Sequence, residues 1–316
     1  MKTRLGSLIV AGTVLTALVG AHAQDSIVAD GSRAFVKRPQ RHSPAARTAD
    51  LGPGGSGLVY VIAGNTFRFG ALDLSSGAFL PIGPVLPSDV GGGLVQGLGT
   101  SLLTLAFSGD LVAIDPFTGL TSVIGEGTGL ADCSVLPSGS YPYDPNCPLV
   151  IGRLGGSFYA TDYANNLYLV DPKTGAATLI GPTGMPPVTF APFSQNPNGT
   201  FNVFSENFVS AHGRLYANFA TATTDFETVT PVIEGALYEI DPSTGVATKI
   251  GPTDPNITAM VNVQGTVYAF DVFTNQVLPL DLTTGQTGEP VSDVDPAVMH
   301  LIAGATPARP FPAAGR

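Results

Sequence analysis

Short segments of alternating apolar and polar residues recur along the chain, and each is followed by the same turn-like motif. The motif reads Asp, often Pro, a variable residue, Ser or Thr, and Gly. A second short apolar segment follows, such as Ala177–Ile180, and ends at a Gly-Pro pair in most copies. Alternation with a period of two predicts strands. The five copies of the motif begin at Asp73, Asp115, Asp171, Asp241 and Asp281.

The chemistry of the motif predicts a tight β-hairpin. An Asp side chain can accept a hydrogen bond from the backbone two residues later, Pro presets φ, and Gly tolerates a positive φ. A type I turn closed by a left-handed Gly joins antiparallel strands. We therefore interpret the five aspartates as turn-capping residues, although carboxylates at a fixed spacing also suggest catalysts.

Two more strands are expected before each hairpin. Comparable pairs are Leu94–Leu98 with Leu102–Phe107, Leu149–Leu154 with Ser157–Thr161, Asn207–His212 with Arg214–Phe219, and Ile257–Gln264 with Thr266–Phe270. Four antiparallel strands in a repeated unit are typical of a propeller blade.

The first unit lacks its inner strand, because Leu58–Ala63 already matches a second strand. Val298–Gly304, at the other end, has the missing pattern. We predict an all-β, five-bladed β-propeller in which this C-terminal strand completes the first blade. A six-bladed ring, with an unrecognised blade within Gly184–Glu206, is the alternative.

The repeat units LYLVDPKTG and LYEIDPSTG, followed by ATLIGP and ATKIGP, resemble those of secreted bacterial β-propeller proteins of unknown function. The resemblance covers roughly residues 58–304. It implies a fold and an exported protein, and it carries over no catalytic residue, because the matching positions belong to turns and strands.

The ends of the chain differ from the repeats. Met1–Ala23 has a basic start, an apolar middle and an Ala-His-Ala site, which predicts a secretory signal peptide. Residues 24–57 are basic and Gly-rich and predict a disordered leader, and residues 306–316 predict a disordered tail. Residues 58–305 are expected to form one domain. No later segment is long and apolar enough for a membrane span.

Two cysteines remain in the expected mature chain. An exported protein meets an oxidising compartment, so Cys133 and Cys147 are expected to form a disulfide, with two free thiols as the alternative. We expect the protein to be secreted or periplasmic.

The charge balance restricts the class of partner. Residues 51–305 hold 21 acidic and five basic residues. Such a surface disfavours nucleic acid, because phosphates require a basic face. A protein or a carbohydrate partner remains open, and a monomer is expected.

Long insertions are predicted on one face of the ring. Antiparallel order puts the Asp-x-x-x-Gly turns on one face, and it puts Gly129–Pro148, Thr183–Ser205 and Ala220–Gly235 on the other. Long loops on a rigid scaffold often carry function. Tyr141, Tyr143 and Phe193 are therefore candidate binding residues. The alternative is that the insertions have no function and are merely tolerated by the fold.

Inner strands should line a central channel. Aligning them places Arg153, Ser210 and Asn262 in one inward column, and His212 and Gln264 in the next. These polar residues predict a water-filled pore and are candidate ligand-binding residues. Arg153 could bind an anionic group or pair with a nearby carboxylate.

Little catalytic chemistry is visible. Asp162 and Asp271 follow second strands and are weak Ca²⁺ candidates, with turn capping as the alternative. No nucleophile-elbow or metalloprotease motif is present. We expect no cofactor and hypothesise a non-catalytic binding scaffold that uses the loop-bearing face. The alternative is a propeller-type hydrolase or lyase that acts on a polysaccharide with carboxylates at the channel mouth.

Overall fold

The computed structural model describes residues 57–64, 66–87, 89–125, 128–133, 146–186, 200–225, 231–295 and 301–305. The predicted signal peptide, almost all of the leader, and the tail lie outside the described residues. In the described part, no helix is long and apolar enough to cross a membrane.

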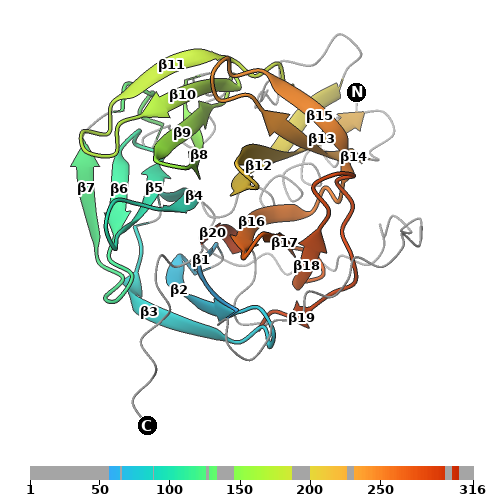
Figure 1. Cartoon of the computed structure of the whole chain (residues 1–316), viewed down its shortest axis with the longest axis horizontal. Coiled ribbons are helices and arrows are strands. Elements are labelled where there is room, and N and C mark those ends of the chain that lie inside the picture. The colour runs from blue at the N-terminus through green and yellow to red at the C-terminus, as the bar shows by residue number, and fades with distance from the viewer. Residues whose placement is uncertain are drawn as a thin grey trace, which may run out of the picture.

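The described strands form five four-stranded antiparallel sheets, which surround one axis as a five-bladed β-propeller (Figure 1). The predicted fold is confirmed, and the described sheets leave no sixth blade. The strands of the first two blades are β20 (Leu301–Ala305), β1 (Leu58–Ala63), β2 (Arg68–Asp73) and β3 (Phe79–Val85), then β4 (Val90–Gln96), β5 (Leu102–Ala106), β6 (Leu111–Ile114) and β7 (Thr121–Gly125).

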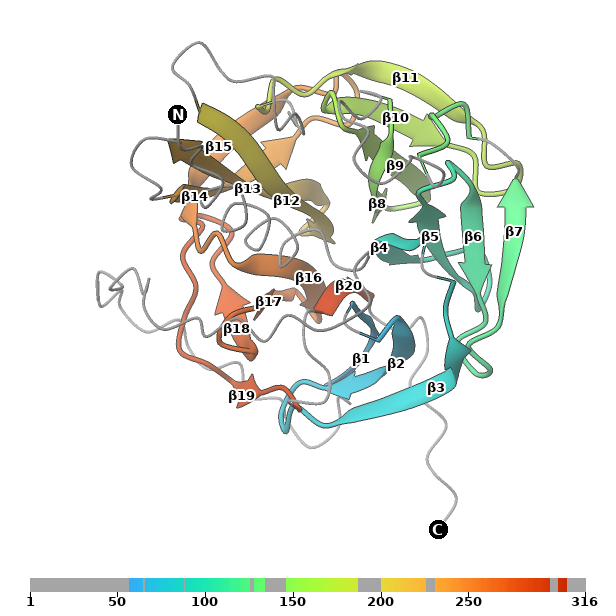
Figure 2. The same ribbon diagram turned by 180° about the vertical axis from the view of Figure 1, so that it is seen from behind.

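The other three blades follow in chain order, and the view from behind shows the same ring (Figure 2). Their strands are β8 (Pro148–Leu154), β9 (Ser157–Asp162), β10 (Asn166–Val170) and β11 (Ala177–Pro182), β12 (Thr200–Ala211), β13 (Arg214–Asp225), β14 (Pro231–Ile240) and β15 (Ala247–Thr253), and β16 (Ile257–Val263), β17 (Thr266–Asp271), β18 (Gln276–Leu280) and β19 (Ser292–Asp293).

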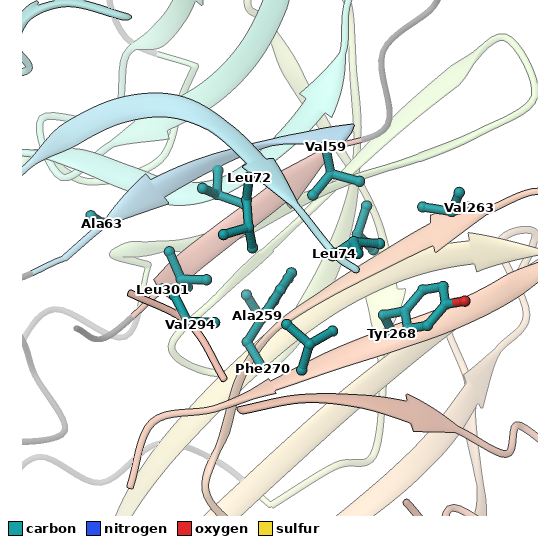
Figure 3. Close-up of a cluster of buried hydrophobic side chains, with 13 residues drawn as sticks. Val59, Ala63, Leu72, Leu74, Ala259, Val263, Tyr268, Phe270, Val294 and Leu301 are labelled. Carbon is teal, nitrogen blue, oxygen red and sulfur yellow. The ribbon is translucent and has the colours of Figure 1, made fainter. Parts of the chain in front are cut away.

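The C-terminal strand closes the ring, as predicted. β20 pairs antiparallel with β1, with Tyr60 opposite Ala305 and Val61 opposite Gly304. Side chains of the first and fifth blades pack together beneath this closure, including Val59, Leu72 and Phe270 (Figure 3). Because closure buries apolar surface from both chain ends, it fixes the first blade to the last.

The hydrophobic core is divided among the blade interfaces rather than gathered at one centre. Each of five clusters of buried residues draws its members from two neighbouring blades. The interface of blades two and three, for example, joins Leu103 and Leu105 to Ile151 and Phe158. Each blade is therefore stabilised through both of its neighbours.

The repeated aspartates cap their own turns. In all five copies a carboxylate oxygen of the Asp accepts from the backbone N–H two residues later, at 2.8–2.9 Å. The N–H of the motif Gly donates to the carbonyl of the Asp at 2.8 Å. The capping interpretation is thus confirmed.

The Gly-Pro pairs have a different role from the one the sequence indicates. The outer strands include these pairs, and Gly181 and Pro182 are the last two residues of β11. A Cβ atom at Gly181 would lie 2.7 Å from the Thr244 carbonyl oxygen in the motif turn of the next blade. Gly83, Gly125 and Gly251 approach the next blade's turn in the same way. The glycine therefore permits close contact between blades.

Strand register defines the two faces of the ring. In the second blade Gln96 pairs with Leu102, and Leu102 pairs with Ile114, so the first–second turn and the Asp115 turn share one end. We call this end the turn face. The second–third loops and the connections between blades lie at the opposite end, which we call the loop face.

The fourth blade is longer than the sequence predicts. β12 and β13 pair without interruption from Thr200 opposite Asp225 to Ala211 opposite Arg214. The pairing of β13 with β14 extends to Thr224 opposite Pro231. The parts of the predicted loops Thr183–Ser205 and Ala220–Gly235 at residues 200–205, 220–225 and 231–235 are therefore strand. Cross-strand backbone hydrogen bonds stabilise them as a ribbon.

Candidate functional site: the loop face and the central pocket

The loop face carries three departures from the repeat, all around the third and fourth blades. The connection from β7 to β8 includes both cysteines, the connection from β11 to β12 follows Pro182, and the β12–β14 ribbon extends the fourth blade. The register places all three at the same end of the ring. Tyr141, Tyr143 and Phe193, predicted on these insertions, lie outside the described residues.

A disulfide fixes the first insertion to the ring. Cys133 and Cys147 are bonded, with a Cα–Cα distance of 5.8 Å, as predicted. The Cys133 N–H donates to the Phe107 carbonyl of blade two at 2.7 Å, and the Tyr163 N–H of blade three donates to the Cys147 carbonyl at 3.0 Å. The disulfide therefore anchors the insertion to both blades.

The disulfide also belongs to the core. Cys147 is fully buried, and both cysteines pack with Met185 and Phe208 in the cluster between blades three and four. The base of the insertion is thus held by apolar packing as well as by a covalent bond.

A small pocket of about 230 Å³ marks the central axis. Its lining comes from the inner strands of all five blades, including Val95, Phe208, Met260 and Ala305. The predicted water-filled polar pore is therefore only partly right, because apolar side chains share the lining with polar ones. Five inner strands form a narrow ring, so their side chains reach one another.

Arg153 lies at the turn-face end of this pocket. Its guanidinium donates to the carbonyls of Gln96 at 2.8 Å, Gly97 at 3.2 Å and Gly155 at 2.9 Å. It also lies 5.3 Å from the ring centre of Phe158. These contacts join blade three to blade two, so the geometry uses Arg153 as a bridge between backbones rather than as half of an ion pair.

Asn262 has the equivalent position in the fifth blade. Its side-chain amide donates to the Ser210 carbonyl of blade four at 2.7 Å, and its side-chain oxygen accepts from the Gly265 N–H at 2.9 Å. Arg153, Ser210 and Asn262 all line the pocket, which agrees with their predicted common column. The column is a set of blade-to-blade contacts.

His212 and Gln264 occupy hairpin turns. Their φ values are 52° and 54°, each is followed by a Gly with positive φ, and neither is among the residues that line the pocket. A left-handed pair of this kind joins two strands with a two-residue turn. The structure therefore places these two candidates at the turn-face rim and not inside the channel.

The two calcium candidates cap loops in their own blades. Asp162 is fully buried and accepts from the Asn166 N–H at 2.8 Å, the Asn166 amide at 2.9 Å and the Tyr168 hydroxyl at 2.7 Å. Burial of the Tyr168 hydroxyl raises its pKa above the usual range, and the hydrogen bond to the Asp162 carboxylate raises it further. Asp271 accepts from the N–H groups of Phe273 and Thr274 at 2.8 and 2.9 Å. These bonds favour the capping interpretation.

The pocket lining includes no residue able to act as an acid or base in glycoside hydrolysis. Its described residues include no Asp, Glu or His. Among the residues that the structure describes, no group of three or more His, Cys, Asp or Glu could hold a metal ion. The described lining of the central pocket thus shows no paired carboxylates, whereas the alternative hypothesis of a hydrolase or lyase places its carboxylates at the channel mouth.

Sequence reasoning missed two features of this region. The β12–β14 ribbon was missed because the Thr-rich segment 220–225 lacks apolar alternation, and because the alternation of Phe201 with Val203 was assigned to a loop. The inner-strand glycines were also missed, although a Cβ at Gly152 would lie 2.6 Å from the Phe208 ring. A Gly in the middle of an inner strand is the signal that could have indicated the narrow ring.

Comparisons with known proteins identify neither a family nor an activity for this chain. No family model matches the chain, and no curated protein matches it by sequence. Similar solved structures include a nidogen/laminin complex, at 12% identity over 78% of this chain and 97% of that chain, with a TM-score of 0.43.

Two further similar structures differ from each other in kind. A Bacteroides thetaiotaomicron protein of unknown function is 14% identical over 72% of this chain and 53% of that chain, with a TM-score of 0.42, so this chain spans about half of it. A catalytically inactive virginiamycin B lyase from Staphylococcus aureus with quinupristin is 11% identical over 73% and 69%, with a TM-score of 0.35. The similar structures thus include a complex and an enzyme, and they assign no activity to this chain.

Proposed function

We propose that this protein is an exported, non-catalytic interaction scaffold that binds a protein or carbohydrate partner through the loop face. The observation that carries this proposal is the clustering of three insertions at one end of one sector of the ring. A long connection, a disulfide-anchored connection and an extended three-stranded ribbon surround blades three and four.

The rest of the ring supports this assignment by contrast. On the loop face, blades one and five have short connections in their described parts, and the turn face repeats nearly the same motif five times. The disulfide agrees with an oxidising compartment, which together with the predicted signal peptide supports a secreted or periplasmic location. The acidic balance favours a partner that does not present phosphates.

Replacing part of the connection from β11 to β12 tests the proposal. Residues 187–199 are exchanged for a short Gly-Ser linker, and partners from the export compartment are captured by affinity purification and identified by mass spectrometry. We expect the captured partner to disappear while the melting temperature stays unchanged. The control is a Lys173→Ala/Ser243→Ala variant on the turn face, which should capture the same partner. Unchanged capture by the loop-replaced variant contradicts the proposal.

A further inference from the structure

The turn face of the second blade departs from the other four copies of the repeat. The variable position of the motif holds Phe117 in this blade, whereas the other blades have Ser75, Lys173, Ser243 and Thr283. Phe117 is 62% exposed and Leu120, directly after the motif Gly, is 60% exposed. Two exposed apolar side chains on one turn form a small apolar patch, which marks a candidate interaction site.

These residues lie beside a groove of about 260 Å³. Its lining combines apolar atoms of Pro116 and Leu120 with the hydroxyl groups of Thr100, Ser101, Thr121 and Ser122 and the carboxylate of Asp115. Leu98, 46% exposed, extends the apolar rim on the same turn, because Ser101 donates to the Leu98 carbonyl at 3.1 Å. The groove thus offers an apolar strip with one negative charge.

The C-terminal end of the described chain is close to this groove. Ala305, the last described residue, pairs with Tyr60, and both belong to one buried cluster with Leu102 and Ile114, which directly adjoin Ser101 and Asp115 of the groove. Burial, and secondarily the charge of Asp115, raises the pKa of Tyr60. β20 runs toward the turn face, because Leu301 pairs with Ala63 and Ala305 with Tyr60. The chain therefore leaves the ring on the same face as the groove and beside it.

The sequence that follows Ala305 has the complementary chemistry. It contains Pro307, Pro310 and Pro312, with Arg309 and Phe311 between them and no acidic residue. A Pro-rich segment of this kind favours a polyproline II helix, which docks on apolar grooves at a low entropy cost. Four residues of such a helix span about 12 Å, so Arg309 can reach the region of Asp115.

We propose that the segment Thr306–Pro312 of this chain docks in the groove of the second blade, with Arg309 facing Asp115 and Phe311 packing against Phe117 and Leu120. This is an intramolecular contact on the turn face, separate from the partner site proposed for the loop face. It occupies the one motif turn whose variable residue is aromatic.

A competition experiment tests the proposal. A fluorescein-labelled peptide of residues 306–316 is titrated with the full-length exported protein, and binding is followed by fluorescence anisotropy. A tethered segment acts at an effective concentration of about 1 mM, so against an intrinsic Kd of about 100 μM it weakens peptide binding about tenfold. We therefore expect the full-length variant Arg309→Glu/Phe311→Ser to bind the peptide about tenfold more tightly than the wild type.

A matched pair of substitutions locates the peptide. In the Arg309→Glu/Phe311→Ser background, Leu120→Gln is expected to weaken peptide binding at least tenfold. Val246→Gln, at the equivalent exposed position of blade four, is expected to leave peptide binding unchanged. Both substituted side chains are exposed, and unchanged melting temperatures verify folding.

The proposal is overturned if the wild type and the Arg309→Glu/Phe311→Ser variant bind the peptide equally, or if Leu120→Gln has no more effect than Val246→Gln. Sedimentation velocity distinguishes an intramolecular contact from a contact between two copies of the chain. A wild-type dimer that dissociates in the Arg309→Glu/Phe311→Ser variant shows that the segment docks on a second copy, which also contradicts an intramolecular contact.

Discussion

The two faces of this ring are produced by the same five repeats, and they differ in what varies. On the turn face the Asp, the Gly and the contact with the neighbouring blade recur nearly unchanged. On the loop face the connections vary in length, and the fourth blade extends into a ribbon. The comparison teaches that the repeated residues hold blades together, whereas the departures from the repeat lie on the surfaces that we propose for recognition.

Removing the disulfide should have the largest effect on the loop face. Cys133 and Cys147 are separated by 14 residues, and closing a loop of that length stabilises a fold by about 3 kcal/mol. We expect a Cys133→Ala/Cys147→Ala variant to lose about this much free energy of unfolding in a urea titration. A loss well below 1 kcal/mol contradicts the view that the disulfide anchors the insertion.

Adding one methyl group at a repeated blade contact should have a comparable or smaller effect. A Cβ at Gly125 would overlap the Thr174 carbonyl oxygen, so Gly125→Ala is expected to cost about 1–3 kcal/mol in a urea titration. Gly156→Ala is the matched control, because no atom lies within 4 Å of a Cβ there. The control should change stability by less than about 0.5 kcal/mol. Equal effects of the two substitutions contradict the role of Gly125 in the contact between blades.

Arg153 and Arg214 make different kinds of contact, and substituting each one tests which kind contributes more to stability. Arg153 bridges blades through backbone carbonyls, whereas Arg214 pairs with Glu239 at 2.7 Å with its side chain 59% exposed. We expect Arg153→Met to cost about 1 kcal/mol, because carbonyls of two blades lose a charged donor. Arg214→Met should cost about 0.5 kcal/mol or less. Thermal and urea unfolding of both variants checks the order, and the reverse order would refute the bridging role.

Acid should weaken the turn face slightly. The backbone N–H of Lys173 and the hydroxyl of Thr174 lower the pKa of Asp171, and the hydroxyl and backbone N–H of Ser243 lower the pKa of Asp241. A carboxyl group whose pKa is lower in the folded chain than in the unfolded chain stabilises the fold at any pH above the unfolded pKa of about 3.9. This stabilisation is lost as the pH falls through the pKa of the folded chain.

An Asp171→Asn/Asp241→Asn variant isolates this charge effect. Asn retains the hydrogen-bond acceptor of each turn and removes the titrating group. The melting temperature of the variant is therefore expected to fall less than that of the wild type between pH 5 and pH 2.5. This is the smallest of the expected effects, and parallel pH profiles would show that the turn carboxylates contribute no charge-dependent stability.

The sequence predicted those features that depend on local chemistry. The turns at Asp73 and its four equivalents, the ring closure by the last strand, and the Cys133–Cys147 bond are all confirmed. Turn preferences and strand alternation act within a few residues, so a single repeat unit contains them. The repeat also fixes the two faces, because antiparallel order leaves no choice.

Features that depend on neighbouring blades escaped prediction. The role of Gly181 depends on Thr244, which lies in another blade, and the contacts of Arg153 depend on how near blade two lies. His212 and Gln264 were assigned by alternation, which cannot distinguish the last strand residue from the first turn residue. The candidate groove of blade two was also missed, although Phe117 at a polar position of the repeat was a visible signal.

Site-specific photocrosslinking tests the central claim that recognition occurs on the loop face. A photoreactive amino acid is placed at Thr223 on the ribbon of the fourth blade or at Ser243 in the turn of the same blade, and crosslinks form in the native export compartment. We predict a discrete adduct from position 223 and none from position 243. Adducts from position 243 alone, or the same adduct from both positions, would contradict the assignment of the binding face.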